Sequence, residues 1–379
     1  MSPSRPQASR ALDRVLDPLV RPTAVVYCEA NFGMVDGKTA NGLVRRSETY
    51  EIRSVIDSHR AGRDAGMVLD GRPNGIPVVS DLDAAAPAGG PPPDFLVFGI
   101  APSSGMLSSG QRDLLLDAMS RGMGLVNGLH EFLNDDPEFA AAAAINDVTI
   151  VDVRRPKAKQ DLHTFSGRIM EVACPRIAIL GTDCAIGKRT TATILVDALN
   201  ERGVRAVLVG TGQTGLMQGA HGIALDAVPA QFGAGEMEAA VVDAWEDSHP
   251  EVIVIEGQGA LSHPAYSSSA FILRGSMPHG VVLQHAPGRI ARSDFPAFAM
   301  PTPADEIRLI ETFADTRVIG LTINHEDMSD TEVSAAIALY EVAFGLPTTD
   351  ALTRSPQRLV DMVAQALPEV AGLLSVAVV

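Results

Sequence analysis

The stretch RIAILGTDCAIGKRTTATILVDAL, residues Arg176–Leu199, determines how the second half of this chain folds. Its apolar first part predicts a strand, the glycine-bounded segment Gly181–Gly187 a loop, and the residues from about Arg189 onward a helix. Glycines let backbone amides turn inward around a phosphate, the helix N-terminus adds partial positive charge, and Lys188 reaches the outer phosphates. The chain has only four lysines, which argues against a chance Gly-Lys pair in an ordinary strand–turn–helix. We therefore predict a phosphate-binding loop in an α/β domain.

This loop departs from the standard phosphate-loop pattern in two ways. Five residues, not four, separate its glycines, and Arg189 stands where a Ser or Thr would hold Mg²⁺. The backbone cradle remains, so the sequence predicts binding of a polyphosphate or pyrophosphate without a protein-bound metal. Asp183 is predicted to orient a ligand group or a water. The residues predicted to bind the phosphate-bearing cofactor here are Gly181, Thr182, Asp183, Cys184, Ala185, Ile186, Gly187, Lys188, Arg189 and Thr190.

The segment VIVIEGQGALSHPAY places Glu256 at the carboxyl end of an apolar strand, where open α/β sheets bind ligands. This carboxylate could be a metal partner, a general base, an orienting group, or a cap for the subsequent loop. His263 and Tyr266 lie in the same loop, and each is either a proton shuttle or a structural hydrogen bonder.

Two further loops come after predicted strands of the same domain. LVGTGQTGLMQG contains four glycines together with Thr211, Gln213 and Thr214, so a ligand could approach its backbone closely. VVLQHAPGR ends in Arg289, which is either a bidentate grip for a phosphate or carboxylate or a surface side chain. Both loops are therefore predicted to border the ligand.

The first half of the chain also alternates strand and helix, which predicts a parallel α/β sheet. Asp57 ends a strand where dinucleotide-binding domains carry a ribose-binding acid, but the first loop has no G-x-G-x-x-G spacing, so this signal is weak. The predicted strands are 23–28, 50–56, 76–79, 94–100, 124–126 and 148–153. The residues of this half that are predicted to bind the substrate are Arg63, Ser103, Ser104 and Arg154.

The fold class predicted is α/β, with a Rossmann-like domain followed by a P-loop NTPase-like domain. A polar tail with a short helix occupies 1–22, the first domain 23–156, a basic linker 157–172, and the second domain 173–379. The second domain's predicted strands are 176–180, 205–209, 252–255, 280–284 and 317–323. Its predicted helices are 190–201, 235–245, 303–314, 330–344 and 354–367.

Composition excludes several classes of protein. The 46 acidic and 30 basic residues give a net charge of −16, which repels nucleic acid and anionic membranes, so neither is an expected partner. The three cysteines have no metal-type spacing, and no apolar run reaches the roughly 18 residues of a membrane span. A reducing, cytoplasmic location is expected.

Several motifs together resemble a two-domain family whose characterised members are D-glutamate N-acetyltransferases. They include GKTANGLVR at Gly37–Arg45, VIDSHRAGRDAG, GIAPSSG, GTDCAIGKRTTA and EGQGALSHPAY, and run in the expected order from about Thr23 to Arg289. The phosphate loop and the EGQG segment are also similar to those of dethiobiotin synthetase, an ATP-dependent enzyme with Thr directly after the lysine. The family resemblance implies acetyl-CoA as acetyl donor, a small amino-acid acceptor, and a homo-oligomer.

The roles that this resemblance suggests are those that acetyl transfer requires. Glu256 is predicted as base or orienting acid with His263 as the alternative, and backbone near Thr211–Thr214 as donor to the oxyanion. Two alternatives remain open: an ATP- and Mg²⁺-dependent ligase or kinase, and a non-catalytic nucleotide-binding regulator. The residues predicted as catalytic are Glu256, His263 and Asp183, and those predicted to bind substrate are Arg63, Ser103, Ser104, Arg154, Gln258, Tyr266 and Arg289.

Overall fold

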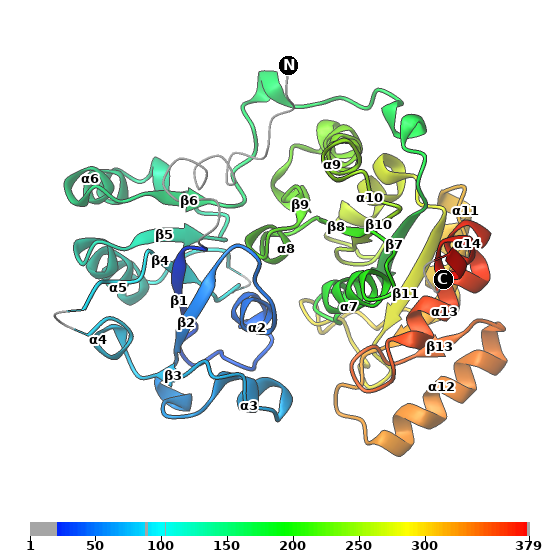
Figure 1. Cartoon of the computed structure of the whole chain (residues 1–379), viewed down its shortest axis with the longest axis horizontal. Coiled ribbons are helices and arrows are strands. Elements are labelled where there is room, and N and C mark those ends of the chain that lie inside the picture. The colour runs from blue at the N-terminus through cyan, green and yellow to red at the C-terminus, as the bar shows by residue number, and fades with distance from the viewer. Residues whose placement is uncertain (1–20, 88–89, 103, 377–379) are drawn as a thin grey trace. The chain divides into compact units, whose positions relative to one another are not determined.

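The computed structural model describes residues 21–87, 90–102 and 104–376 of the chain (Figure 1). The predicted N-terminal tail with its helix therefore lies almost wholly outside the described residues. Two compact units are present: the described residues up to Lys157 with Leu216–Gly219, and Ala158–Gly215 with the described residues from Ala220 onward. No helix in the part of the chain that the structure describes is long and apolar enough to cross a membrane.

The first unit is built on a sheet of six strands among its described residues, all parallel, in the order β3-β2-β1-β4-β5-β6. This is the strand order of Rossmann folds. Every residue of β4, the strand predicted from DFLVFGI, is buried, as expected for a parallel strand covered on both faces. The strands are β1 (Thr23–Tyr27), β2 (Glu51–Ile56), β3 (Val78–Val79), β4 (Phe95–Phe98), β5 (Gly124–Asn127) and β6 (Ile150–Asp152).

Four of the five helices described in this unit, all except α2 (Lys38–Arg45), begin after a polar side chain that accepts a hydrogen bond from an amide of the first turn. Ser108 and Gln111 form a capping box at one helix, and the Asp136 carboxylate caps another that begins with Pro137. These signals lie in the local sequence, which is why both helices could be predicted. The helices are α2 (Lys38–Arg45), α3 (Ala65–Asp70), α4 (Leu82–Ala85), α5 (Ser109–Ser120) and α6 (Pro137–Asn146).

The second unit contains a sheet of seven parallel strands among its described residues, in the order β13-β12-β11-β7-β10-β8-β9. Successive residues of its central strand join cores on opposite faces: Ile177 and Ile179 on one, Ala178 and Leu180 on the other. The prediction of two parallel α/β sheets is thus confirmed. The strands are β7 (Arg176–Gly181), β8 (Ala206–Gly210), β9 (His221–Gly222), β10 (Val252–Glu256), β11 (Gly280–His285), β12 (Val318–Ile323) and β13 (Thr348–Thr349).

Helices cover both faces of this second sheet (Figure 1). The helix after the phosphate loop begins at Lys188, earlier than predicted, because Gly187 caps it with a positive φ of 96°. The helices are α7 (Lys188–Asn200), α8 (Gln213–Met217), α9 (Gly233–Ser248), α10 (Ser268–Ser276), α11 (Pro303–Phe313), α12 (Asp330–Phe344), α13 (Gln357–Ala366) and α14 (Pro368–Val376).

Part of the predicted linker is held against α9 by two buried carboxylates. Glu236 accepts a hydrogen bond of 2.6 Å from the backbone amide of His163, and Glu238 accepts bonds of 2.6 and 3.2 Å from the amides of Ser166 and Ile169. Because these carboxylates satisfy backbone donors that would otherwise be orphaned, this stretch is an ordered part of the second unit.

Four residues that come shortly after β8 belong to the first unit. Met217 is buried in the first unit's core, and the Gln218 side-chain amide donates to the carbonyls of Gly42 (2.8 Å) and Arg46 (2.9 Å). Nothing in the sequence indicates this excursion.

Candidate functional site

The phosphate loop runs from the end of β7 to the first residue of α7, as predicted. Ala185 and Gly187 both have positive φ, and the Lys188 ammonium turns back to donate to the Asp183 carbonyl. A Cβ on Gly181 would lie 2.8 Å from the Ile186 side chain and 2.9 Å from the Gln284 carbonyl, so only glycine fits there. Backbone amides, a helix N-terminus and a lysine are thereby gathered at one end of the sheet.

Asp183, a residue of this loop, lies at the centre of a cluster of buried charged side chains. Its Oδ2 accepts hydrogen bonds from Arg289 Nη1 (3.2 Å) and from the Ser293 amide (2.9 Å). Its Oδ1 lies 3.9 Å from Arg292 Nη1 and 3.9 Å from His263 Nε2. The carboxylate is fully buried, so these cations and donors replace its hydration.

All three guanidinium nitrogens of Arg289 donate hydrogen bonds, and two of them, Nη1 and Nη2, donate to residues of the phosphate loop. Nε and Nη2 donate to Glu326 Oε2 at 3.0 and 2.7 Å, and Nη2 also donates to the Ala185 carbonyl at 3.1 Å. Nη1 donates to Asp183 and, at 2.9 Å, to the Cys184 carbonyl. A guanidinium has five N–H donors and these five bonds use them, so a substrate carboxylate could bind Arg289 only by displacing one of them. Substrate binding by Arg289 stays a prediction.

Two residues that the sequence did not single out complete this support. Arg292 donates to the Thr182 carbonyl (3.2 Å) and to Ser262 Oγ (2.9 Å), which ties the phosphate loop to the loop after β10. Glu306, fully buried on α11, accepts a bond of 2.6 Å from the Leu261 amide. The sequence contains one sign of this support, which is that Arg292 is a second arginine three residues after Arg289.

Glu256 ends β10 and lies beside the loop after β8. Its Oε2 accepts a hydrogen bond of 3.1 Å from the Thr211 amide, and Thr211 Oγ1 donates to its carbonyl at 3.0 Å. Burial raises the pKa of Glu256, while the cations Arg189 and Lys188 and the amides of Thr211 and Gly212 oppose that rise. The positive charges of Arg189 and Lys188 thus act on Glu256, and its burial gives the carboxylate an increased affinity for a proton.

The remaining predicted cofactor-binding residues lie around this core in different ways. Thr182 is buried and shares a 2.9 Å hydrogen bond with His285, a histidine whose pKa burial lowers to about 4. Thr190 is half-buried in the first turn of α7, and Gln213 and Thr214 are buried in α8. The amides of Thr211 and Gly212 are engaged by Glu256, so a donor role toward an oxyanion stays a prediction.

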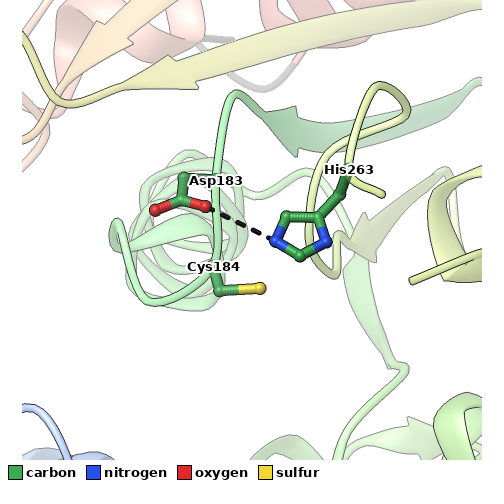
Figure 2. A group of neighbouring side chains, drawn as sticks. All are labelled: Asp183, Cys184 and His263. Atoms are coloured by element: carbon green, nitrogen blue, oxygen red, sulfur yellow. Dashed lines mark ion pairs between the residues drawn. The ribbon is translucent and has the colours of Figure 1, made fainter. Parts of the chain in front are cut away.

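Figure 2 shows the one group of side chains among the described residues with a donor set suited to a metal ion. One ligand atom each from Asp183, Cys184 and His263 lies within 4.8 Å of the others. Asp183 Oδ1 and His263 Nε2 point toward each other, and both are buried without a hydrogen-bond partner in the part of the chain that the structure describes. Tyr266 stacks on His263 with ring centroids 4.5 Å apart, and its hydroxyl donates to Asp294 at 3.2 Å.

The proton of the His263 ring decides what this group can bind. The Ala265 amide donates to His263 Nδ1 at 3.2 Å, so the neutral ring carries its proton on Nε2, facing Asp183. Burial and the neighbouring Arg292 lower the pKa of His263, which favours that neutral ring. A metal-bound histidine instead donates its other ring N–H, so these residues suit a His–Asp hydrogen bond better than a metal ion.

We expect purified protein, dialysed without chelator, to contain much less than one zinc, cobalt or manganese per chain when measured by plasma mass spectrometry. The physical reason is that the Nε2 lone pair needed for coordination is absent in the favoured tautomer. One retained equivalent of metal that disappears in His263→Ala but persists in the matched surface variant His249→Ala would contradict this expectation.

Three of the predicted substrate-binding residues, Arg63, Ser104 and Arg154, belong to the first unit. Arg154 is buried, with its Nε donating to the Gly128 carbonyl at 2.6 Å, whereas Arg63 and Ser104 are exposed. Ser103 lies outside the described residues. A joint role of these residues with the phosphate loop stays a prediction.

Asp57 of the first unit serves as a loop anchor. Its carboxylate accepts hydrogen bonds from the backbone amides of Ala30 (3.2 Å), Phe32 (3.1 Å) and His59 (3.0 Å), and its side chain is buried. A ribose-binding acid must present its oxygens to a ligand. The weak resemblance to a dinucleotide site therefore has no support in the geometry.

Two family models match most of the chain. A P-loop domain described as a domain of unknown function, DUF1611_C, matches residues 163–360, and a Rossmann-like domain, DUF1611_N, matches residues 58–156. The Rossmann-like and P-loop assignments made from the sequence are thereby confirmed.

The chain is also similar to two proteins that are named D-glutamate N-acetyltransferase. The protein from Tritonibacter scottomollicae is 32% identical over 276 residues, covering 71% of this chain and 80% of that protein. The protein from Pseudoalteromonas sp. is 30% identical over 262 residues, covering 68% and 77%. The crystal structure of a DUF1611 family protein from Anabaena variabilis is 34% identical, with a TM-score of 0.83 over 91% of this chain and 100% of that one.

Proposed function

Because this chain belongs to the DUF1611 family and is similar to two proteins named as N-acetyltransferases, we propose that it moves an acetyl group from acetyl-CoA to the amino group of an amino acid. D-glutamate, the amino acid in the names of both relatives, is the acceptor we propose first.

The observation that carries this proposal is the buried carboxylate of Glu256 beside two cations. Acetyl transfer to an amine releases a proton, and a base with a raised pKa takes it up near neutral pH. Burial raises the pKa of Glu256, and the opposing influence of Arg189 and Lys188 places those cations close to the carboxylate. This supports one site in which Glu256 is the base and the two cations bind the phosphates of the cofactor.

The phosphate groups of CoA suit the loop without any metal. CoA carries a pyrophosphate and a 3′-phosphate, and the amides of Gly181–Gly187 with Lys188 and Arg189 supply donors and positive charge for them. Arg189 occupies the position at which a P-loop enzyme of phosphoryl transfer places its Mg²⁺-binding hydroxyl. This substitution favours anchoring of phosphates over their transfer.

In the reaction that we propose, the lone pair of the neutral amine attacks the thioester carbonyl carbon and forms the new C–N bond. Glu256 takes one proton from the nitrogen, the C–S bond breaks as the carbonyl re-forms, and CoA leaves as a thiolate that is then protonated. The products are the N-acetyl amino acid and CoA, and no oxidant, reductant or nucleotide hydrolysis is needed.

A second candidate function is an ATP- and Mg²⁺-dependent ligase or kinase. A phosphate loop next to a strand that ends in a carboxylate, here Glu256, favours it because a carboxylate at that edge can hold Mg²⁺. The acetyltransferase requires acetyl-CoA, whereas the ligase or kinase requires ATP and Mg²⁺, so measurements of ligand binding distinguish the two functions.

We expect acetyl-CoA at about 100 times its Kd, without added metal, to raise the unfolding temperature by several degrees, because such a ligand adds roughly 2.7 kcal/mol. Lys188→Ala should lose most of this shift. Lys38→Ala is the matched control, since Lys38 also comes directly after a glycine and begins a helix, but lies exposed in the first unit. A shift with ATP and Mg²⁺ only, measured by scanning fluorimetry or calorimetry, would favour the ligase.

A further inference from the structure

The geometry around Gly212 points to a two-acceptor amine site: we propose that Gln258, through its side-chain oxygen, and Glu256 each accept one N–H of the attacking amine. The enzyme would therefore use primary amines and reject secondary ones. This inference rests on the proposed acetyl transfer and extends it by naming the class of acceptor.

The first observation is an unpaired acceptor. The Gln258 amide group donates from Nε2 to the Thr211 carbonyl at 2.7 Å, and only its NH₂ end can donate to a carbonyl. The orientation of the amide is thereby fixed, and Oε1 faces the other way. Oε1 is buried and has no hydrogen-bond partner among the described residues. A buried acceptor without a partner is rare in native proteins, and a donor from a bound molecule, either water or a ligand, would satisfy it.

The second observation is that Gln258 and Glu256 meet at the same turn. Glu256 accepts from the Thr211 amide at 3.1 Å, while Gln258 donates to the carbonyl of that same residue. The next residue, Gly212, has no side chain, and a Cβ there would lie 2.9 Å from Gln258 Nε2 and 4.0 Å from Glu256 Oε1. A Cβ at position 212 would therefore displace the Gln258 amide from its place beside Thr211, while it would make only ordinary contact with Glu256.

The stereochemistry of the attacking nitrogen matches two acceptors. A neutral primary amine has one lone pair and two N–H bonds. With the lone pair directed at the thioester carbon, one N–H can point to Glu256, which takes that proton as the C–N bond forms, and the other to Gln258 Oε1. A secondary amine has only one N–H, so its alkyl group would face a buried oxygen that stays unpaired.

The electrostatics favour the reactive form of the amine. Lys188 and Arg189 act on Glu256 through their positive charge. The same charges disfavour an ammonium ion near the carboxylate and so favour loss of its proton. The amide oxygen of Gln258 then orients the amine without adding a second negative charge that would hold it as an ammonium ion.

The test compares D-glutamate with N-methyl-D-glutamate in the full chain, by measuring CoA thiol release. Because an unpaired buried acceptor is unfavourable, we expect kcat/KM to favour the primary amine by about 5- to 150-fold. Gln258→Met keeps the side-chain length and removes the acceptor. In that variant we expect the preference to fall below about threefold, through a higher KM for the primary amine, with the Kd for acetyl-CoA unchanged. Gln357→Met, at a half-buried position on α13, is the matched control.

Each outcome decides one proposal. Equal use of the two amines by the wild type would overturn the amine site and leave acetyl transfer intact. A primary-amine preference that survives in Gln258→Met would assign the preference to steric exclusion and overturn the role of Oε1. The absence of CoA release with any primary amino acid would instead overturn the acetyltransferase proposal and, with it, the amine site. If Gln258→Met fails to fold, the wild-type comparison still tests the requirement for two N–H bonds.

Discussion

Glu256→Gln is expected to lower kcat for acetyl transfer by about 10²- to 10⁴-fold, while the Kd for acetyl-CoA stays unchanged. The amide keeps the size of the side chain and can still face the Thr211 amide with its oxygen, but it cannot take a proton from the amine. CoA thiol release measures kcat, and calorimetry measures the Kd. Glu201→Gln, at the exposed end of α7, is the control for loss of one negative charge.

The pH profile provides independent evidence on the same variant. A general base works only when ionised, so below the pKa of Glu256 the wild type should lose one further unit of log kcat/KM per pH unit, beyond the fall that protonation of the amine substrate gives to both enzymes. Because burial raises this pKa, this further fall should begin above the usual glutamate range near 4.3. Residual activity of Glu256→Gln should lack this limb. An unchanged kcat, or the same limb in the variant, would remove Glu256 as the base.

Arg289→Ala is expected to lower the free energy of unfolding by about 3–5 kcal/mol and the unfolding temperature by several degrees. The substitution removes every hydrogen bond of the guanidinium, including the one to Asp183, and leaves that fully buried carboxylate short of a cation. Denaturant titration of the second unit's transition gives the free energy. Arg308→Ala is the control, because Arg308 pairs with Asp305 at the surface and should change stability by under about 1 kcal/mol.

A double-mutant cycle identifies the cause of that loss. If an uncompensated buried charge is responsible, adding Asp183→Asn to Arg289→Ala should recover part of the stability, although Asp183→Asn alone destabilises the wild type. A loss in Arg289→Ala no larger than in Arg308→Ala would show that Arg289 does not brace the loop. Additive effects of the two substitutions would show that Arg289 acts through the loop carbonyls and not through Asp183.

Most of the fold could be predicted because its signals are local. The helix α12 occupies the range 330–344 predicted for it, since the capping box of Ser329 and Glu332 starts it and Gly345 ends it. By contrast, α10 was not predicted. Its sequence SSAFILRGS is short and polar at both ends, and burial of Ile272 and Leu273 in the second unit's core stabilises it instead.

Only the part of the site that follows the carboxyl ends of strands could be predicted from the sequence. The phosphate loop and Glu256 lie at the same edge of the sheet because β7 and β10 are parallel neighbours, with the loop leaving the carboxyl end of β7 and Glu256 ending β10. The cluster around Asp183 has a different origin, since Arg289 lies 106 residues away along the chain. Whether an arginine compensates a buried carboxylate or binds a ligand depends on three-dimensional packing, and a single sequence contains no pattern for it.

The excursion of Leu216–Gly219 into the first unit has a consequence for how this protein can be divided. A fragment that ends at Lys157 would contain the whole first sheet but would lack Met217 from its core and the Gln218 amide that serves Gly42 and Arg46. The first unit is therefore not an interchangeable module in the sense that gene fusion or domain shuffling requires. Recombination between relatives at the boundary near residue 157 would preserve both sheets and still separate one unit from part of its own interior.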